Sequence, residues 1–225
     1  MPPARTTTAW GVVVPVKVLA VAKSRLASYG DPLREQLALA FAVDVVTACL
    51  ACPDLVRVLV VTDDPRAARA LTALGADVAA DGPDAGLNPA LAHGAALLRA
   101  GLGECGVVTV SSDLPTLRPD DLTAALAGVP PLGRAFVADL ESSGTTLLAA
   151  GPGAALLPAY GAASRQRHLD SGAVELWAPA TLRRDVDTPA DLQEALRLGV
   201  GARTTEVAGA VGGRTGPVDG APWVV

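Results

Sequence analysis

The chain has 225 residues, of which 50% are hydrophobic, and a formal net charge of −5. A chain of this length fits one domain, and because only 3% of the residues are aromatic, the core must consist mainly of Ala, Val and Leu. The acidic balance argues against nucleic acid as a partner, since such a partner needs a basic face. We find no run of the roughly 20 apolar residues that spans a bilayer, so we expect a cytoplasmic protein without a membrane partner.

The first half of the chain predicts strands that alternate with helices. Trp10 to Val16 is a near-continuous apolar run, as expected of a strand that is covered on both faces. Asp31 and Pro32 indicate the N-cap and the first residue of a helix that ends near Ala48. Further strands are expected at 56–62 and 76–80, and further helices at 65–74 and 88–100.

The second half centres on a short buried strand at 107–111. Next we expect a helix at 119–127, an antiparallel strand pair at 135–139 and 145–150, a helix at 164–171, a strand at 181–186 and a helix from Thr188 to about Leu198. The pattern predicts an α/β fold in three layers with a mostly parallel sheet, and a single domain at 9–200. Residues 201–225, rich in Gly, Ala and Pro, are expected to form a flexible tail.

Two acidic turns are the leading candidates for chemistry. Asp113 lies just past the strand at 107–111, and Asp187 lies just past the strand expected at 181–186. In open α/β sheets, ligands bind at the carboxyl ends of the strands. Two carboxylates there can hold Mg²⁺ and leave positions for phosphate and water. The alternative for each is a turn or helix-cap residue, and Asp185 is a lower-ranked ligand in the second turn.

A cationic loop follows the first strand. Lys17, Lys23 and Arg25 lie within nine positions of one another, which suits a polyphosphate. The alternative is a solvated basic loop. The chain contains neither the G-x-x-x-x-G-K-[ST] motif of a P-loop nor a G-x-G-x-x-G motif after the first strand.

Other polar segments have two interpretations each. The turn at 142–146 could be an anion-binding nest or a plain hairpin connection. Gly161 and Ser164 precede or begin a helix, and nearby cations favour a phosphate or carboxylate there. His168 could act as a general base, although we favour a binding or structural role. Cys49 and Cys52 form a C-x-x-C spacing, which we interpret as structural because no second such pair follows.

Several short motifs occur in a fixed order: Val14-Pro15-Val16-Lys17, Ala22-Lys23-Ser24-Arg25-Leu26, Val61-Thr62-Asp63, Leu87-Asn88, Ser112-Asp113-Leu114-Pro115, Gly144-Thr145-Thr146, Ser164 with His168, and Asp185-Val186-Asp187-Thr188-Pro189. This ordered set resembles the guanylyltransferases of coenzyme F-420 biosynthesis, which activate 2-phospho-L-lactate or phosphoenolpyruvate with GTP. The resemblance covers roughly Trp10 to Val200.

The resemblance implies a Rossmann-like nucleotidyltransferase fold, of the kind found in nucleotide-diphospho-sugar transferases. Relatives in that superfamily open with a Gly-rich loop, which the segment from Pro15 to Arg25 replaces here. The implied roles are as follows: Asp113 and Asp187 bind Mg²⁺; Thr146, Gly161 and Ser164 bind the phosphoacid; Lys17, Lys23 and Arg25 face the GTP phosphates and, with Asp113, form the catalytic set; and Asn88 lies near the nucleoside.

The implied reaction is attack of a substrate phosphate oxygen on the α-phosphorus of GTP, with release of pyrophosphate. Phosphoenolpyruvate is the expected acceptor, and 2-phospho-L-lactate and 3-phosphoglycerate are the alternatives. The product would then pass to the next enzyme of the pathway. The rival interpretations are a different small nucleotidyltransferase, which uses CTP or a sugar phosphate, and a non-catalytic nucleotide sensor of the same fold.

Overall fold

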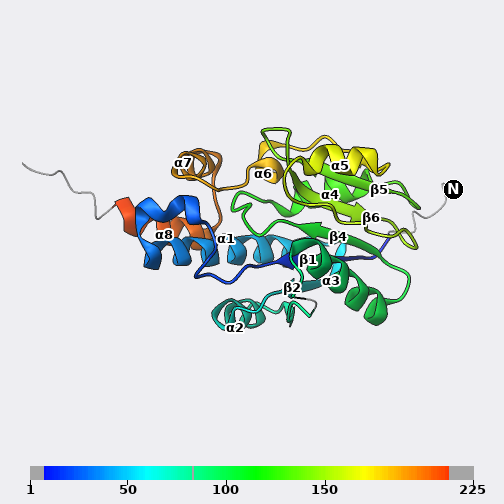
Figure 1. Cartoon of the computed structure of the whole chain (residues 1–225), viewed down its shortest axis with the longest axis horizontal. Coiled ribbons are helices and arrows are strands. Elements are labelled where there is room, and N and C mark those ends of the chain that lie inside the picture. The colour runs from blue at the N-terminus through cyan, green and yellow to red at the C-terminus, as the bar shows by residue number, and fades with distance from the viewer. Residues whose placement is uncertain (1–7, 83, 213–225) are drawn as a thin grey trace, which may run out of the picture.

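A computed structural model describes residues 8–82 and 84–212 of the chain. Its centre is a seven-stranded sheet with the order β3-β2-β1-β4-β6-β5-β7 (Figure 1). The strands are β1 (Trp10–Pro15), β2 (Leu55–Val61), β3 (Asp77–Ala79), β4 (Gly106–Val110), β5 (Arg134–Ala138), β6 (Thr145–Ala150) and β7 (Val174–Glu175).

The sheet is mostly parallel. β1 pairs in parallel with β2 and β4, β2 with β3, and β5 with β7, whereas β6 runs antiparallel to both β4 and β5. The reversal confirms the antiparallel pair expected near residues 135–150. It also places the start of β6 beside the carboxyl end of β4, where Ser111 N–H donates to the Thr146 carbonyl at 2.9 Å.

Helices cover both faces of the sheet, which confirms the predicted three-layer α/β fold. α1 (Asp31–Ala51), α2 (Pro65–Ala73), α4 (Pro119–Ala127) and α6 (Ala180–Arg183) pack on the face to which Val12 and Val14 point. α3 (Leu87–Leu102) and α5 (Ser164–Asp170) pack on the opposite face, with Val13. Alternate residues of a strand therefore contribute their side chains to two separate cores, one on each face of the sheet. No helix in the described part of the chain is both long and apolar enough to cross a membrane.

The predicted helix starts are close to those observed. Asp64 caps α2 through hydrogen bonds from the amides of Arg66 and Ala67, and Thr188 caps α7 (Pro189–Leu198) in a reciprocal arrangement with Asp191. For α1, the structure differs from the prediction: the N-cap is Gly30, and Asp31 is the first helical residue. This helix also extends three residues past Ala48, to Ala51.

The prediction of a strand at 181–186 is wrong. Residues Ala180–Arg183 form the single helical turn α6, and Arg184 to Asp187 is a loop. Thr181 Oγ1 donates to Asp121 Oδ2 at 2.6 Å, and Leu182 is fully buried. Tertiary contacts with α4 and the sheet thus decide the conformation of a segment too short to show a period.

The expected flexible tail also differs from the structure over residues 202–212. Here Ala202–Gly212 form α8, which packs against α1 (Figure 1). Thr204 and Val207 are buried, and the Asp44 carboxylate of α1 accepts from the amides of Arg203 and Thr204 at 3.0 and 2.8 Å. Trp223 to Val225, at the end of that tail, lie outside the described residues.

We expect the Asp44→Ala variant to be less stable than the wild type by about 1–2 kcal/mol, because two amides in the first turn of α8 lose their acceptor. Asp44→Asn retains one oxygen acceptor and should lose less. Urea unfolding of the three proteins measures the difference. Equal stability of Asp44→Ala and wild type would show that α8 does not depend on this carboxylate.

Candidate active site

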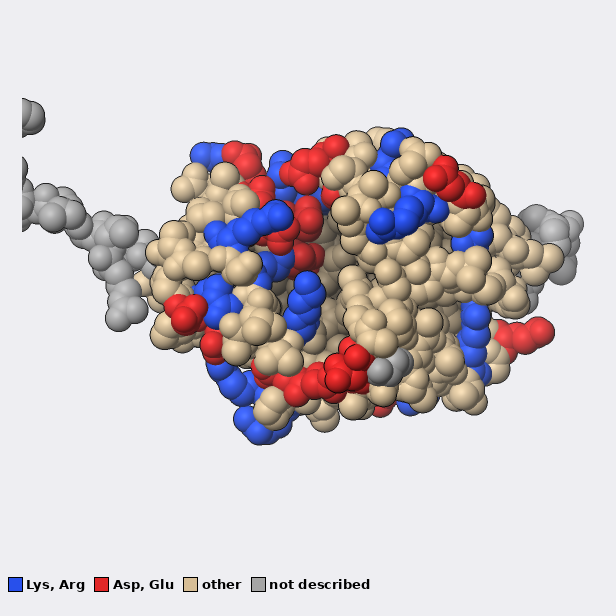
Figure 2. Space-filling model, in the orientation of Figure 1, with Lys and Arg blue, Asp and Glu red and all other residues tan. Residues whose placement is uncertain are grey.

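A cavity of about 500 Å³ opens at the sheet edge where β1 and β4 end and β6 begins. Acidic and basic side chains meet in this hollow, as Figure 2 shows. Five of the segments that line it contribute polar residues, which are Lys17, Lys23, Ser24, Arg25, Ser111, Ser112, Asp113, Asp139, Thr145, Tyr160, Ser164, Asp185 and Asp187. The expected carboxylates and cations therefore lie in one site.

The segment between β1 and α1 has a fixed shape although it is not rich in glycine. The buried guanidinium of Arg34 donates to the carbonyls of Leu19 at 3.1 Å, Ala20 at 2.8 Å and Ala22. The amide of Leu19 donates to Asp64 Oδ2 at 2.9 Å. A helix side chain and a helix cap thus satisfy the main chain of the loop that carries the three cations.

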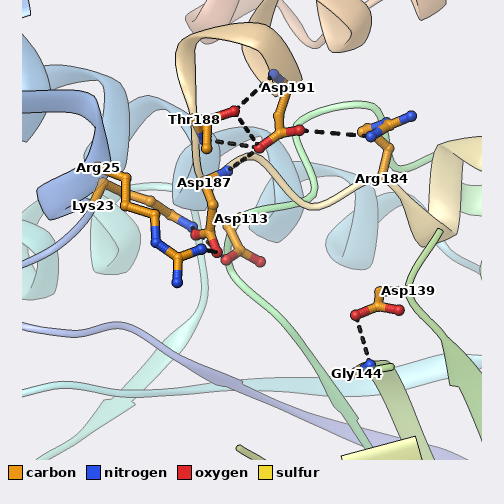
Figure 3. A network of polar contacts seen from close by, with 9 residues as sticks. All are labelled: Lys23, Arg25, Asp113, Asp139, Gly144, Arg184, Asp187, Thr188 and Asp191. Atoms are coloured by element: carbon orange, nitrogen blue, oxygen red, sulfur yellow. Dashed lines mark hydrogen bonds and ion pairs between the residues drawn. The ribbon is translucent and has the colours of Figure 1, made fainter. Parts of the chain in front are cut away.

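Lys23 lies between the two predicted metal ligands (Figure 3). Its Nζ is 2.5 Å from Asp113 Oδ2 and 2.7 Å from Asp187 Oδ1, and only 12% of its side chain is exposed. Burial alone would lower the pKa of Lys23, but the two carboxylates outweigh it and raise the pKa. Arg25 is much more exposed and reaches Asp187 Oδ2 at 3.5 Å, while Lys17 is exposed at the cavity wall.

Asp187 reaches the site from a loop before α7, not from a strand end as predicted. Burial acts to raise its pKa, but Lys23, then Arg25 and Lys17, hold the pKa below its usual range. The neighbouring Val186 is fully buried in an apolar cluster with residues of α1, α7 and α8. The same cluster includes Leu26 of the 3₁₀ helix η1 (Ser24–Tyr29), so one small core supports both charged loops.

Asp185 shares the cavity wall with Asp113 and Asp187. Its pKa is raised to about 7, first by burial and then by the two neighbouring carboxylates. Among the described residues, no group of three or more His, Cys, Asp or Glu side chains has the arrangement of a metal site. Two carboxylates nevertheless suffice for Mg²⁺, which retains waters and binds substrate phosphates.

One atom of Asp113 fits such a cation. Its Oδ1 is buried and has no hydrogen-bond partner among the described residues, while Oδ2 accepts from Lys23. A buried carboxylate oxygen without a partner is unfavourable, and a hard cation is one group that would satisfy it.

The hairpin between β5 and β6 does not offer a free anion nest. Asp139 already accepts from the amides of Ser143 at 2.9 Å and Gly144 at 2.7 Å. A Cβ at Gly144 would lie 2.2 Å from Asp139 Oδ2, which explains why a glycine is needed there. The Asp139 carboxylate therefore already occupies these two amides, and the turn is a hairpin connection.

Three side chains fix the segment that precedes α5. The Asn88 amide holds both main-chain groups of Tyr160, accepting from its N–H at 2.7 Å and donating to its carbonyl at 3.1 Å. Arg167 donates to the carbonyls of Ala159 and Tyr160 at 3.0 and 2.9 Å. His168 Nε2 accepts from Ala159 N–H at 3.1 Å. Asn88, expected near the nucleoside, thus shapes the loop that leads to Gly161.

The three expected acceptor residues take different positions. Gly161 and Ser164 line the cavity, with Gly161 at a φ of 113° that favours glycine. Thr146 does not line it, because its hydroxyl is buried and donates to the Leu182 carbonyl at 2.8 Å. Its neighbour Thr145 faces the cavity instead.

Sequence reasoning missed Arg34 and Asp139, and it named Thr145 and Arg167 only as members of the turn at 142–146 and of the cations near Ser164. The Asp31–Arg34 spacing suggests only an exposed helical pair, and nothing in a single sequence marks Arg34 as buried. For Asp139, the signal was present: an acid at a strand end, followed by Ser-Ser-Gly, is typical of a carboxylate-capped turn.

Comparisons with known proteins find relatives over most of the chain. A family model described as guanylyl transferase CofC like matches residues 10–215. A phosphoenolpyruvate guanylyltransferase of Streptomyces coelicolor is 56% identical over 202 residues, which covers 88% of this chain and 95% of that protein.

Solved structures share the fold. A nucleotidyl transferase from Methanothermobacter superposes with a TM-score of 0.60 at 19% identity, over 84% of this chain and 98% of that one. A Mycobacterium tuberculosis H37Rv protein in complex with manganese superposes with a TM-score of 0.51 at 20% identity, over 85% of this chain and 99% of that one.

The buried His168 predicts a pH dependence of stability. Burial, together with Arg167 and Arg134, lowers its pKa from 6.5 to about 4. Between these values the unfolded imidazole binds more protons than the folded one, so the contribution of His168 to the free energy of unfolding should fall as the pH falls. His168 alone should lower the free energy of unfolding by about 2 kcal/mol between pH 7.5 and 4.5.

Urea unfolding at several pH values measures this effect. Compared with the wild type, His168→Gln should lose less stability as the pH falls from 6.5 to 4.5, while His93→Gln, which leaves His168 in place, should not show this difference. A curve of the same slope for His168→Gln and the wild type would contradict the prediction.

Proposed function

This chain belongs to the CofC-like guanylyl transferase family, and we propose that it transfers the guanylyl group of GTP to phosphoenolpyruvate. The products are enolpyruvyl-2-diphospho-5′-guanosine and pyrophosphate, within coenzyme F-420 biosynthesis, where the next pathway enzyme consumes the former. The observation that carries the proposal is the set of Lys23, Asp113 and Asp187 in one cavity at the carboxyl edge of the sheet.

The cationic loop is proposed to bind the GTP phosphates. Lys17 and Arg25 are exposed at the cavity wall and can reach a triphosphate without disturbing the core. Lys23 supplies the third positive charge. Its side chain is the most buried of the three and lies between two carboxylates. Since Arg34 and Asp64 fix the main chain of the loop, the backbone positions that carry these charges are set before the nucleotide arrives.

The acceptor is proposed to lie beside Gly161 and Ser164, which line the same cavity as the cationic loop. Both positions follow the segment that Asn88, Arg167 and His168 hold in place. Because the Thr146 hydroxyl donates to Leu182, we propose that Thr146 contributes through its backbone position.

Asp113 and Asp187 are the residues proposed to hold Mg²⁺, and the Oδ1 of Asp113, which has no hydrogen-bond partner in the described part of the chain, supports this assignment. The ion would supply positive charge near the reacting phosphate groups. Asp185 lies beside this pair in the cavity wall and is the lower-ranked candidate for a ligand.

Attack by the acceptor requires positioning more than proton transfer. A phosphate oxygen is already ionised near neutral pH and can attack the α-phosphorus of GTP in line, while pyrophosphate leaves on the opposite side. His168 is not available as a general base, because Nε2 accepts from Ala159 and Nδ1 contacts Thr145. The protein's contribution is alignment and charge stabilisation.

Pyrophosphate release with GTP and Mg²⁺ tests the proposal. We expect release with phosphoenolpyruvate to exceed that with 2-phospho-L-lactate or 3-phosphoglycerate, since the Streptomyces coelicolor relative is a phosphoenolpyruvate guanylyltransferase. Replacing GTP by CTP in parallel tests for a different nucleotidyltransferase. Absence of release with all three acids would overturn the proposed function.

Asp113→Asn should reduce turnover at least about a hundredfold, the scale seen when one group that stabilises transition-state charge is removed. The melting temperature should change little, because asparagine can still accept from Lys23. Asp120→Asn, on the exposed first turn of α4, is the matched control and should keep wild-type turnover. Near-wild-type activity of Asp113→Asn would exclude it as a metal ligand.

A further inference from the structure

The side chain of His168 is held at both ring nitrogens. It is fully buried, and Nε2 lies 3.1 Å from Ala159 N while Nδ1 lies 2.9 Å from Thr145 Oγ1. A backbone amide can only donate, so Nε2 must be unprotonated. In neutral imidazole the proton is then on Nδ1, and His168 donates to Thr145.

This direction constrains the hydroxyl pair that comes next. Ser164 Oγ lies 3.2 Å from Thr145 Oγ1, and both side chains line the cavity. The two hydroxyls have two protons between them. Ser164 Oγ donates one of them to Thr145 Oγ1, and His168 needs none because it is itself a donor. The proton of the Thr145 hydroxyl therefore remains to be donated outside the pair.

The opposite tautomer would have a different result. With its proton on Nε2, His168 would accept from Thr145, and the hydroxyl protons could both be used inside the network. The amide of Ala159 prevents this arrangement, since two donors would then face each other. The neighbouring cations Arg134 and Arg167 also disfavour a second proton on the ring.

We propose that His168 is a positioning residue that, through Thr145 and Ser164, presents one hydroxyl proton to an anionic oxygen of the acceptor. The identity of that acceptor rests on the proposed function, but the polarity of the network does not. A site that donates in this way favours a carboxylate or phosphate oxygen, which can only accept. Thr145 thereby becomes a specificity residue of the acceptor subsite.

Calorimetric binding of phosphoenolpyruvate to the full chain with Mg²⁺ tests the role of the hydroxyl. Thr145→Val keeps the shape of the side chain but removes the hydroxyl whose proton is free for the ligand, so the dissociation constant should rise about tenfold or more, as for loss of a hydrogen bond to a charged group. Thr145→Ser restores the hydroxyl and should restore most of the affinity. An unchanged dissociation constant for Thr145→Val would overturn the inference.

A double-mutant cycle tests whether His168 acts through Thr145. If it does, His168→Gln should weaken acid binding in the wild type but have little further effect in Thr145→Val. If His168 has only a structural role, His168→Gln should weaken acid binding equally in the wild type and in Thr145→Val. That result would overturn the inference.

The tautomer can be observed directly, without any variant at the site. The chain has two histidines, so ¹⁵N spectra of the wild type and of His93→Gln assign the His168 ring. We expect a protonated Nδ1 and an unprotonated Nε2 at pH 7. A protonated Nε2 would overturn the inference even if a variant fails to fold.

The outcomes separate this inference from the proposed function. If the wild type binds phosphoenolpyruvate but releases no pyrophosphate, and Thr145→Val weakens binding, the function fails and the inference holds. If the wild type turns over and Thr145→Val binds equally well, the inference fails and the function holds. If the wild type neither turns over nor binds the acid, both fail.

Discussion

The ammonium group of Lys23 joins three parts of the chain that are far apart in sequence. It contacts Asp113, 90 residues away, and Asp187, 164 residues away. The residue itself has a left-handed backbone, with φ at 54°, which costs about 1 kcal/mol or more for a non-glycine residue. The main-chain contacts of Arg34 with the loop just before it help to hold this conformation. The strain is therefore located at the centre of the charged site.

Exposed ion pairs could not hold this geometry by themselves, because such pairs contribute little in water. What fixes the charged loops is burial beneath them. Leu26 and Val186 lie next to Arg25 and Asp187 in sequence, and both are fully buried in the cluster formed with α1, α7 and α8. The electrostatic site thus depends on an apolar core to which the last described helix contributes Val207.

The sequence predicted the sheet and the meeting of acids with cations, because strand ends and buried runs are local signals. It could not predict the features that depend on distant partners. The Asp44 carboxylate of α1 accepts from the first amides of α8 only because α1 and α8 pack together. The choice between Thr145 and Thr146 is a matter of register, since neighbouring strand residues point to opposite sides. Asp187 lies in the cavity with Asp113, but it was expected at the end of a strand that does not form.

The way the first loop is held has a consequence for protein engineering. In a glycine-rich loop, the backbone conformation is encoded in the loop itself, and a short peptide segment carries it. Here the conformation of the segment after β1 depends on a guanidinium from α1 and a carboxylate from the start of α2. Grafting the loop alone onto a related scaffold would transfer its charges without its shape, so Arg34 and Asp64 form part of the smallest transplantable unit.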